Sequence, residues 1–153
     1  MRVFIDFMVV AVILGLVSCK SASTMQGTDV IAKTRISQSK IVVSLRNSSD
    51  QIMVFPGVRA DYIELLVDNQ WERLPYTSCE CGVPCSPAIP QTVKSGATME
   101  FFWDMYARVC NGTEPIETLQ TKGSYRIKFD YQLLDKGMIV KSSSIWVKFD
   151  LPI

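Results

Sequence analysis

The segment Ser124-Tyr-Arg-Ile-Lys-Phe-Asp-Tyr131 contains the clearest pattern in this chain of 153 residues. Aromatic or aliphatic side chains occupy every second position, and Arg126, Lys128 and Asp130 stand between them. Because successive side chains of a β-strand point to opposite faces, this alternation predicts a strand with one face buried and the other in water. The face predicted to be buried consists of Tyr125, Ile127, Phe129 and Tyr131.

The same period of two recurs on both sides of this segment, from Asp29 onwards. Apolar alternation separated by turn residues predicts strands near residues 41–46, 52–55, 63–67, 71–74, 95–103 and 138–151. No segment shows the period of an amphipathic helix. Seven or eight short strands in about 125 residues predict an all-β fold, an antiparallel β-sandwich, with a small closed β-barrel as the alternative.

One motif narrows the fold class further. Gly123-Ser-Tyr-Arg-Ile127, followed by a hairpin through Asp135-Lys136-Gly137, resembles the penultimate strand of an immunoglobulin-like (Ig-like) domain. In that family a tyrosine near the start of this strand hydrogen-bonds back to a loop, and the resemblance implies the same for Tyr125.

The N-terminus has the features of an export signal. Arg2 precedes an uncharged run from Phe7 to Val17, and eleven residues are too few to cross a bilayer, which needs about 20. The run ends in Leu16-Val-Ser-Cys19, which resembles the lipobox of bacterial lipoproteins. That resemblance implies cleavage between Ser18 and Cys19, and a lipid on the Cys19 sulfur that anchors the protein in a bilayer.

The lipobox divides the chain into three parts. We expect a signal peptide, helical in form, over residues 1–18, a flexible tether over 19–28 and the β domain over 29–153. In bacteria with two membranes, an aspartate after the lipidated cysteine tends to retain a lipoprotein in the inner membrane, and Lys20 stands here instead. The resemblance therefore implies the outer membrane, or the outer face of the plasma membrane where only one membrane exists.

The other four cysteines are even in number, which in an exported domain predicts disulfides. They are Cys79, Cys81, Cys85 and Cys110. A Cys79–Cys81 bridge would close a strained ring, so Cys85 should form the local bridge, and Cys110 should pair with Cys79 or Cys81. A zinc site or a redox-active pair is the alternative, although the spacing fits neither paired C-x-x-C knuckles nor a thioredoxin motif.

Composition excludes several functions. The chain has no histidine, so it can build neither a serine–histidine triad nor an imidazole metal site. A net charge of +1 without a basic stripe argues against nucleic acid as a partner. We predict no catalytic residues, no resident metal and no cofactor.

The sequence thus predicts a non-enzymatic binding or structural module that has a protein partner in the cell envelope. Function is expected in the irregular stretches Pro75–Pro90 and Asp104–Lys122, or at an exposed sheet edge. Proteinase inhibition is an alternative, because Val93-Lys-Ser-Gly96, a strand ending in Trp103 and then Gly-Ser-Tyr resemble bacterial Ig-like proteinase inhibitors. Metal or thiol-redox handling by the cysteines is the other. Trp71, Trp103 and Trp146 suit either a ligand platform or, more simply, packing.

Overall fold

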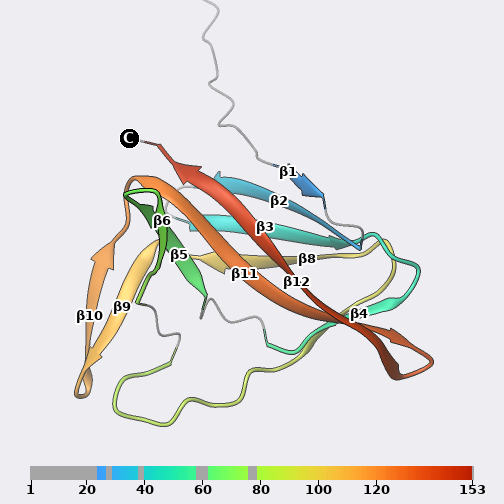
Figure 1. Cartoon of the computed structure of the whole chain (residues 1–153). Helices are drawn as coiled ribbons and strands as arrows, with labels where there is room; N and C mark the ends of the chain where they lie inside the picture. Colours follow the sequence, from blue (N-terminus) through green and yellow to red (C-terminus); the bar gives the residue numbers. More distant parts are fainter. Residues whose placement is uncertain (1–23, 27–28, 38–39, 58–61, 76–78, 153) are drawn as a thin grey trace, which may run out of the picture.

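The structure, a computed structural model, describes residues 24–26, 29–37, 40–57, 62–75 and 79–152. All regular elements in these ranges are β-strands (Figure 1). Ser18, Cys19 and the predicted signal peptide lie outside the described residues. Within the described ranges, no helix is long and apolar enough to span a membrane.

The first sheet has four antiparallel strands in the order β1-β2-β3-β8. These strands are β1 (Thr24–Gln26), β2 (Val30–Ser37), β3 (Lys40–Asn47) and β8 (Thr98–Trp103). The central strand β3 pairs along its full length with β2 on one side and over six residues with β8 on the other.

The second sheet is built around β11. It contains β4 (Ile52–Phe55), β5 (Ile63–Val67), β6 (Gln70–Arg73), β7 (Gln91–Val93), β11 (Gly123–Asp135) and β12 (Met138–Leu151). One edge of β11 pairs with β12, and the other pairs first with β5 and then, further along, with β4. β6 continues from β5, and β7 from β4.

A third, two-stranded sheet projects from one end of the molecule (Figure 1). It is the hairpin of β9 (Tyr106–Asn111) and β10 (Glu114–Leu119), and every residue of β10 is exposed. This hairpin lies in the stretch Asp104–Lys122, which was expected to be irregular, so that expectation is wrong.

The two large sheets pack face to face through aromatic side chains. The ring of Trp103 in β8 lies 5.4 Å from that of Tyr125 in β11 and 6.1 Å from that of Phe149 in β12. Phe101 meets Phe129 edge-on at 5.4 Å. These rings are buried, as fits aromatic pairs that form the core between two sheets.

The predicted sandwich is confirmed, and the closed barrel is wrong because the strands form separate, open sheets. The order is Ig-like: β2, β3 and β8 form one sheet, and the second pairs β12, β11 and β5. All four residues predicted on the inner face of β11 are buried. The hydroxyl of Tyr125 donates a hydrogen bond of 3.0 Å to the carbonyl oxygen of Lys122, as the Ig-like resemblance implied.

Two further differences concern the number and the extent of the strands. The described part of the chain has twelve strands, more than the seven or eight expected, because short strands and the β9–β10 hairpin add to the main ones. β1 also falls within residues 19–28 and pairs with β2, with Thr24 opposite Lys33. The predicted tether is therefore not irregular throughout.

Candidate functional site

The four cysteines of the β domain form two disulfides, Cys79–Cys85 and Cys81–Cys110, which confirms Cys85 in the local bridge and selects Cys81 over Cys79 as the partner of Cys110. The first closes a short loop before β7, and the second ties that loop to β9. Each of the four sulfurs is bonded to its partner in a disulfide. In this structure none of them is therefore a free thiolate, which a zinc ligand or a reduced dithiol would require.

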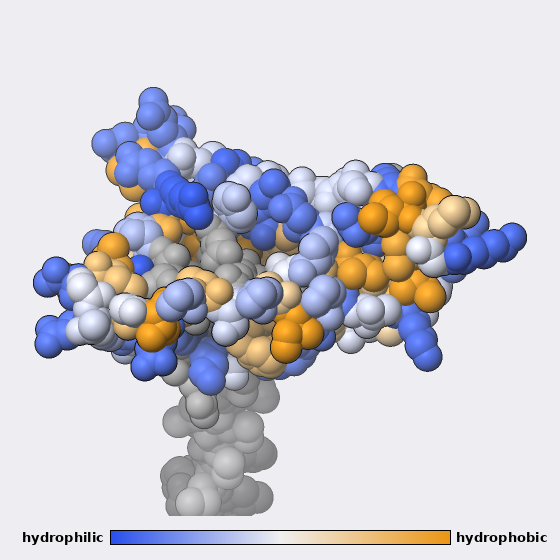
Figure 2. Space-filling model, turned by 90° about the horizontal axis from the view of Figure 1, so that it is seen from below, coloured by the Kyte–Doolittle hydropathy of each residue, from blue (hydrophilic) through white to orange (hydrophobic). Residues whose placement is uncertain are grey.

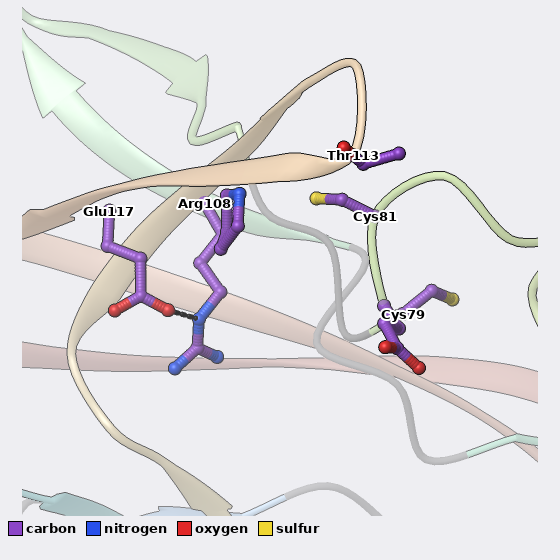
Figure 3. A pocket seen from close by; sticks show the side chains of 7 residues that line it. Cys79, Cys81, Arg108, Thr113 and Glu117 are labelled. Atoms are coloured by element: carbon purple, nitrogen blue, oxygen red, sulfur yellow. Dashed lines mark hydrogen bonds and ion pairs between the residues drawn. The ribbon is translucent and has the colours of Figure 1, made fainter.

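We call the loop closed by Cys79 and Cys85 the stapled loop. Together with the β9–β10 hairpin it encloses an open groove of about 410 Å³ (Figure 3). Its walls are formed by Cys79, Glu80, Cys81, Arg108, Thr113, Pro115 and Glu117. Gly82 packs so closely on the hairpin turn that a Cβ there would lie 2.7 Å from the methyl group of Thr113. The loop is therefore held against the hairpin both covalently and by close packing.

Two of the charged side chains in this groove, Arg108 and Glu117, are paired with each other. Nε of Arg108 donates a hydrogen bond of 2.6 Å to Glu117, and the guanidinium also forms an ion pair with Asp104. The hydrogen bond to Glu117 is the largest cause of a raised pKa for Arg108, so the group stays charged. In the described part of the chain, no three acidic or cysteine side chains cluster as metal ligands would. The groove therefore presents a fixed ion pair at its wall.

A second candidate site is the outer edge of β12. Among the described strands, β12 pairs with β11 alone, so no strand is hydrogen-bonded to the other edge of this strand of 14 residues, although β2 contacts β12 without pairing to it. Ser142, Ser143 and Ser144 lie in its middle, and their side chains are small. Exposed strand edges of this kind present unpaired backbone groups that can pair with another chain.

The pairing of β11 with β12 shows which backbone groups of β12 face its outer edge. The N–H of Lys128 in β11 donates to the carbonyl oxygen of Tyr62, on the side away from β12. Since backbone N–H groups alternate in direction along a strand, Phe129 and Tyr131 point theirs toward β12. Their partners in β12, Ile145 and Ser143, direct their own N–H groups back toward β11. The N–H of Ser144 therefore points outward, away from β11.

The outer face of the second sheet carries a cluster of aromatic and cationic side chains. The guanidinium of Arg126 lies between two indoles, 4.5 Å from the ring centre of Trp71 and 4.2 Å from that of Trp146. Arg126 also forms an ion pair with Glu64. We call these four residues the aromatic cluster. Trp103, by contrast, is fully buried in the core, so the three tryptophans do not form one platform.

No protein-family model matches the sequence, and no curated protein matches it either. The class of the protein is therefore defined by its architecture. It is an Ig-like β-sandwich with a disulfide-stapled loop at one end and an open strand edge along one side.

Proposed function

We propose that this protein is an exported lipoprotein, anchored through a lipid on Cys19, that binds a partner of the cell envelope and catalyses no reaction. Two disulfides suit a domain that folds in an oxidising compartment outside the cytoplasm. The lipobox supports the anchor, and Lys20 after it favours the outer membrane where the host has one.

The observation that carries the binding function is the open edge of β12. A partner segment in extended form adds to such an edge through backbone hydrogen bonds. Ser144 offers an outward N–H at mid-strand, and a partner strand hydrogen-bonded to it would lie at the usual distance of about 4.8 Å. The edge of β10 is less suitable, because that strand has six residues and includes Pro115, which has no N–H to donate.

The edge is tested by a substitution that removes one outward N–H. Ser144→Pro deletes the donor and leaves the ladder to β11 intact, since the N–H of Ser144 takes no part in it. Ser144→Ala keeps the donor and serves as the control. A photo-crosslinking residue at position 142 should capture a single discrete partner in cells, and Ser144→Pro should abolish that adduct while Ser144→Ala retains it. Equal adducts in both variants contradict strand addition.

The anchor is tested independently. We expect full-length protein to sediment with membranes and its N-terminal peptide to carry the mass of a lipid on Cys19. Cys19→Ser should move the protein to the soluble fraction. Unmodified Cys19 in the wild-type protein contradicts the lipoprotein proposal.

Proteinase inhibition is a second candidate, favoured by the geometry of the stapled loop. The Cys79–Cys85 bridge constrains the loop, and Val83 at its tip is 53% exposed. A rigid, exposed loop of this kind can occupy a protease cleft with little loss of conformational entropy. Titration against a panel of serine and cysteine proteases should then give stoichiometric inhibition that Val83→Asp weakens, and hydrolysis without inhibition would exclude it.

A further inference from the structure

The far end of the β11–β12 hairpin carries exposed apolar side chains. Met138 is 68% exposed, Ile139 58%, Val140 51% and Ile52 of the adjoining β4 45%. Figure 2 shows apolar residues gathered at the right-hand end of the molecule, where Figure 1 places this hairpin. We call these four residues, with Leu134, the apolar tip.

The sheet register joins the residues of the apolar tip into a row. Leu134 in β11 is the cross-strand partner of both Ile52 in β4 and Ile139 in β12. Three apolar side chains therefore stand side by side across three strands on the outer face of the sheet. Single exposed apolar residues are ordinary, whereas a contiguous row at a protruding end marks an interaction site.

The apolar tip has apolar side chains on both faces of the hairpin. Met138 and Ile139 are successive residues of β12, so they point to opposite faces. A bulge follows, because Leu133 pairs with Lys141 and Leu134 with Ile139, which leaves Val140 as the extra residue. A flat protein partner would cover only one of these faces, while a lipid phase can surround both.

The start of β2 lies close to the β11–β12 hairpin, and Thr24 of β1 lies opposite Lys33, further along β2. Asp29, just before β2, forms an ion pair with Lys141 and accepts a hydrogen bond of 3.1 Å from the hydroxyl of Tyr131. Only four residues separate Cys19 from Thr24, the first residue of β1, so this connection spans at most about 17 Å. A lipid on Cys19 would therefore hold the domain against the bilayer surface.

We propose that the apolar tip inserts into the interfacial region of the bilayer that holds the lipid of Cys19, an inference that rests on the proposed lipid anchor. Apolar side chains of peripheral segments reach about 5–10 Å into this region, and the nearby Lys136 suits anionic headgroups. The short tether raises the effective concentration of lipid at the tip, so a contact too weak to hold a free protein is sufficient here. This second attachment fixes which side of the domain faces away from the membrane.

The test places a tryptophan at the tip of the full-length, lipidated protein. Ile139→Trp and Met138→Trp probe the two faces, and Val109→Trp, at a 47% exposed position of β9, is the matched control. Each variant is reconstituted in vesicles of phosphatidylethanolamine and phosphatidylglycerol that contain phosphatidylcholine brominated on its acyl chains. We expect both tip variants to be quenched about twofold more than Val109→Trp, relative to the wild-type background.

The outcomes separate the two proposals. Protein that does not float with the vesicles contradicts the lipid anchor on Cys19. Protein that floats, with tip variants quenched no more than Val109→Trp, leaves the anchor standing and overturns the insertion of the apolar tip. A blue-shifted, unquenched tip tryptophan whose emission depends on protein concentration would assign the tip to a second copy of the chain, which also overturns insertion.

Discussion

The side-chain amide of Asn47, at the end of β3, donates a hydrogen bond of 3.0 Å to the carbonyl oxygen of Val93 in β7. This bond joins the two large sheets where the chain passes from one to the other. The same amide donates to the carbonyl of Gln51 at 2.8 Å, and its oxygen accepts from the N–H of Ser49 at 3.0 Å. Asn47 is fully buried, so no water replaces these bonds.

We expect Asn47→Ala to lower the free energy of unfolding by about 2–4 kcal/mol. The substitution leaves the buried carbonyl of Val93 without its donor, and an unsatisfied buried group costs about 1–3 kcal/mol beyond the lost bonds. Urea unfolding measures the change, and Ser49→Ala, at the less buried end of the network, should cost about 1 kcal/mol or less. A loss for Asn47→Ala no larger than that control would contradict the assigned role.

Tyr125 gives the fold a dependence on alkaline pH. Burial raises the pKa of its hydroxyl above the ordinary value of 10.0. The folded state then holds the proton more tightly than the unfolded chain does, so this contribution to stability is complete below pH 10 and is lost as the pH rises through the folded pKa. Tyr131 shifts in the same direction, mainly through burial.

Tyr125→Phe should therefore make the free energy of unfolding less sensitive to pH above about 10. At neutral pH the same variant should be less stable by about 1 kcal/mol, because the hydrogen bond to Lys122 is lost. Urea unfolding at a series of pH values from neutral to alkaline checks both effects. Parallel curves for wild type and variant above pH 10 would show that Tyr125 does not titrate as expected.

Arg126 contacts both indoles of the aromatic cluster, so its removal should change the surroundings of Trp71 and Trp146. Arg126→Ala leaves the partly buried Glu64 without its cation and removes two cation–π contacts, which together predict a loss of about 2 kcal/mol after allowance for solvent screening. Tryptophan fluorescence should shift to the red, since Trp71 and Trp146 gain contact with water. Arg126→Lys keeps the charge and loses the planar group, so an intermediate effect is expected.

The main strands could be predicted because one of their faces is buried. Burial forces an alternation of apolar and polar residues, and Tyr125, Ile127 and Phe129 lie inward as that alternation requires. The turn before β12 could also be predicted. Lys136 and Gly137 have φ angles of 50° and 83°, and tight hairpin turns that require positive φ favour glycine. Ring geometry and an even count of cysteines predicted Cys85 in the local bridge, but they left Cys79 and Cys81 open as the partner of Cys110.

The β9–β10 hairpin, the aromatic cluster and the buried role of Asn47 could not be predicted, because no local sequence pattern indicates them. β9 and β10 are exposed over most of their length, so burial imposed no alternation on them. The aromatic cluster joins Trp71, Arg126 and Trp146 from three strands, and only the pairing register brings such distant residues together. Asn47 stood among turn residues, and its buried role depends on Val93, which is distant in sequence.

The two disulfides should differ in their effect on stability, because they close loops of different length. Cys81–Cys110 joins residues 29 apart in sequence, and Cys79–Cys85 residues 6 apart. By the chain-entropy relation, the longer loop is worth about 3.6 kcal/mol and the shorter about 2.4 kcal/mol. Replacing Cys81 and Cys110 together by serine should therefore cost about 1 kcal/mol more than replacing the other pair, and it should also make the β9–β10 hairpin more sensitive to proteolysis. Unfolding of the two double variants, with free-thiol counts to verify the surviving bridge, measures the difference, and equal losses would show that local packing outweighs loop entropy here.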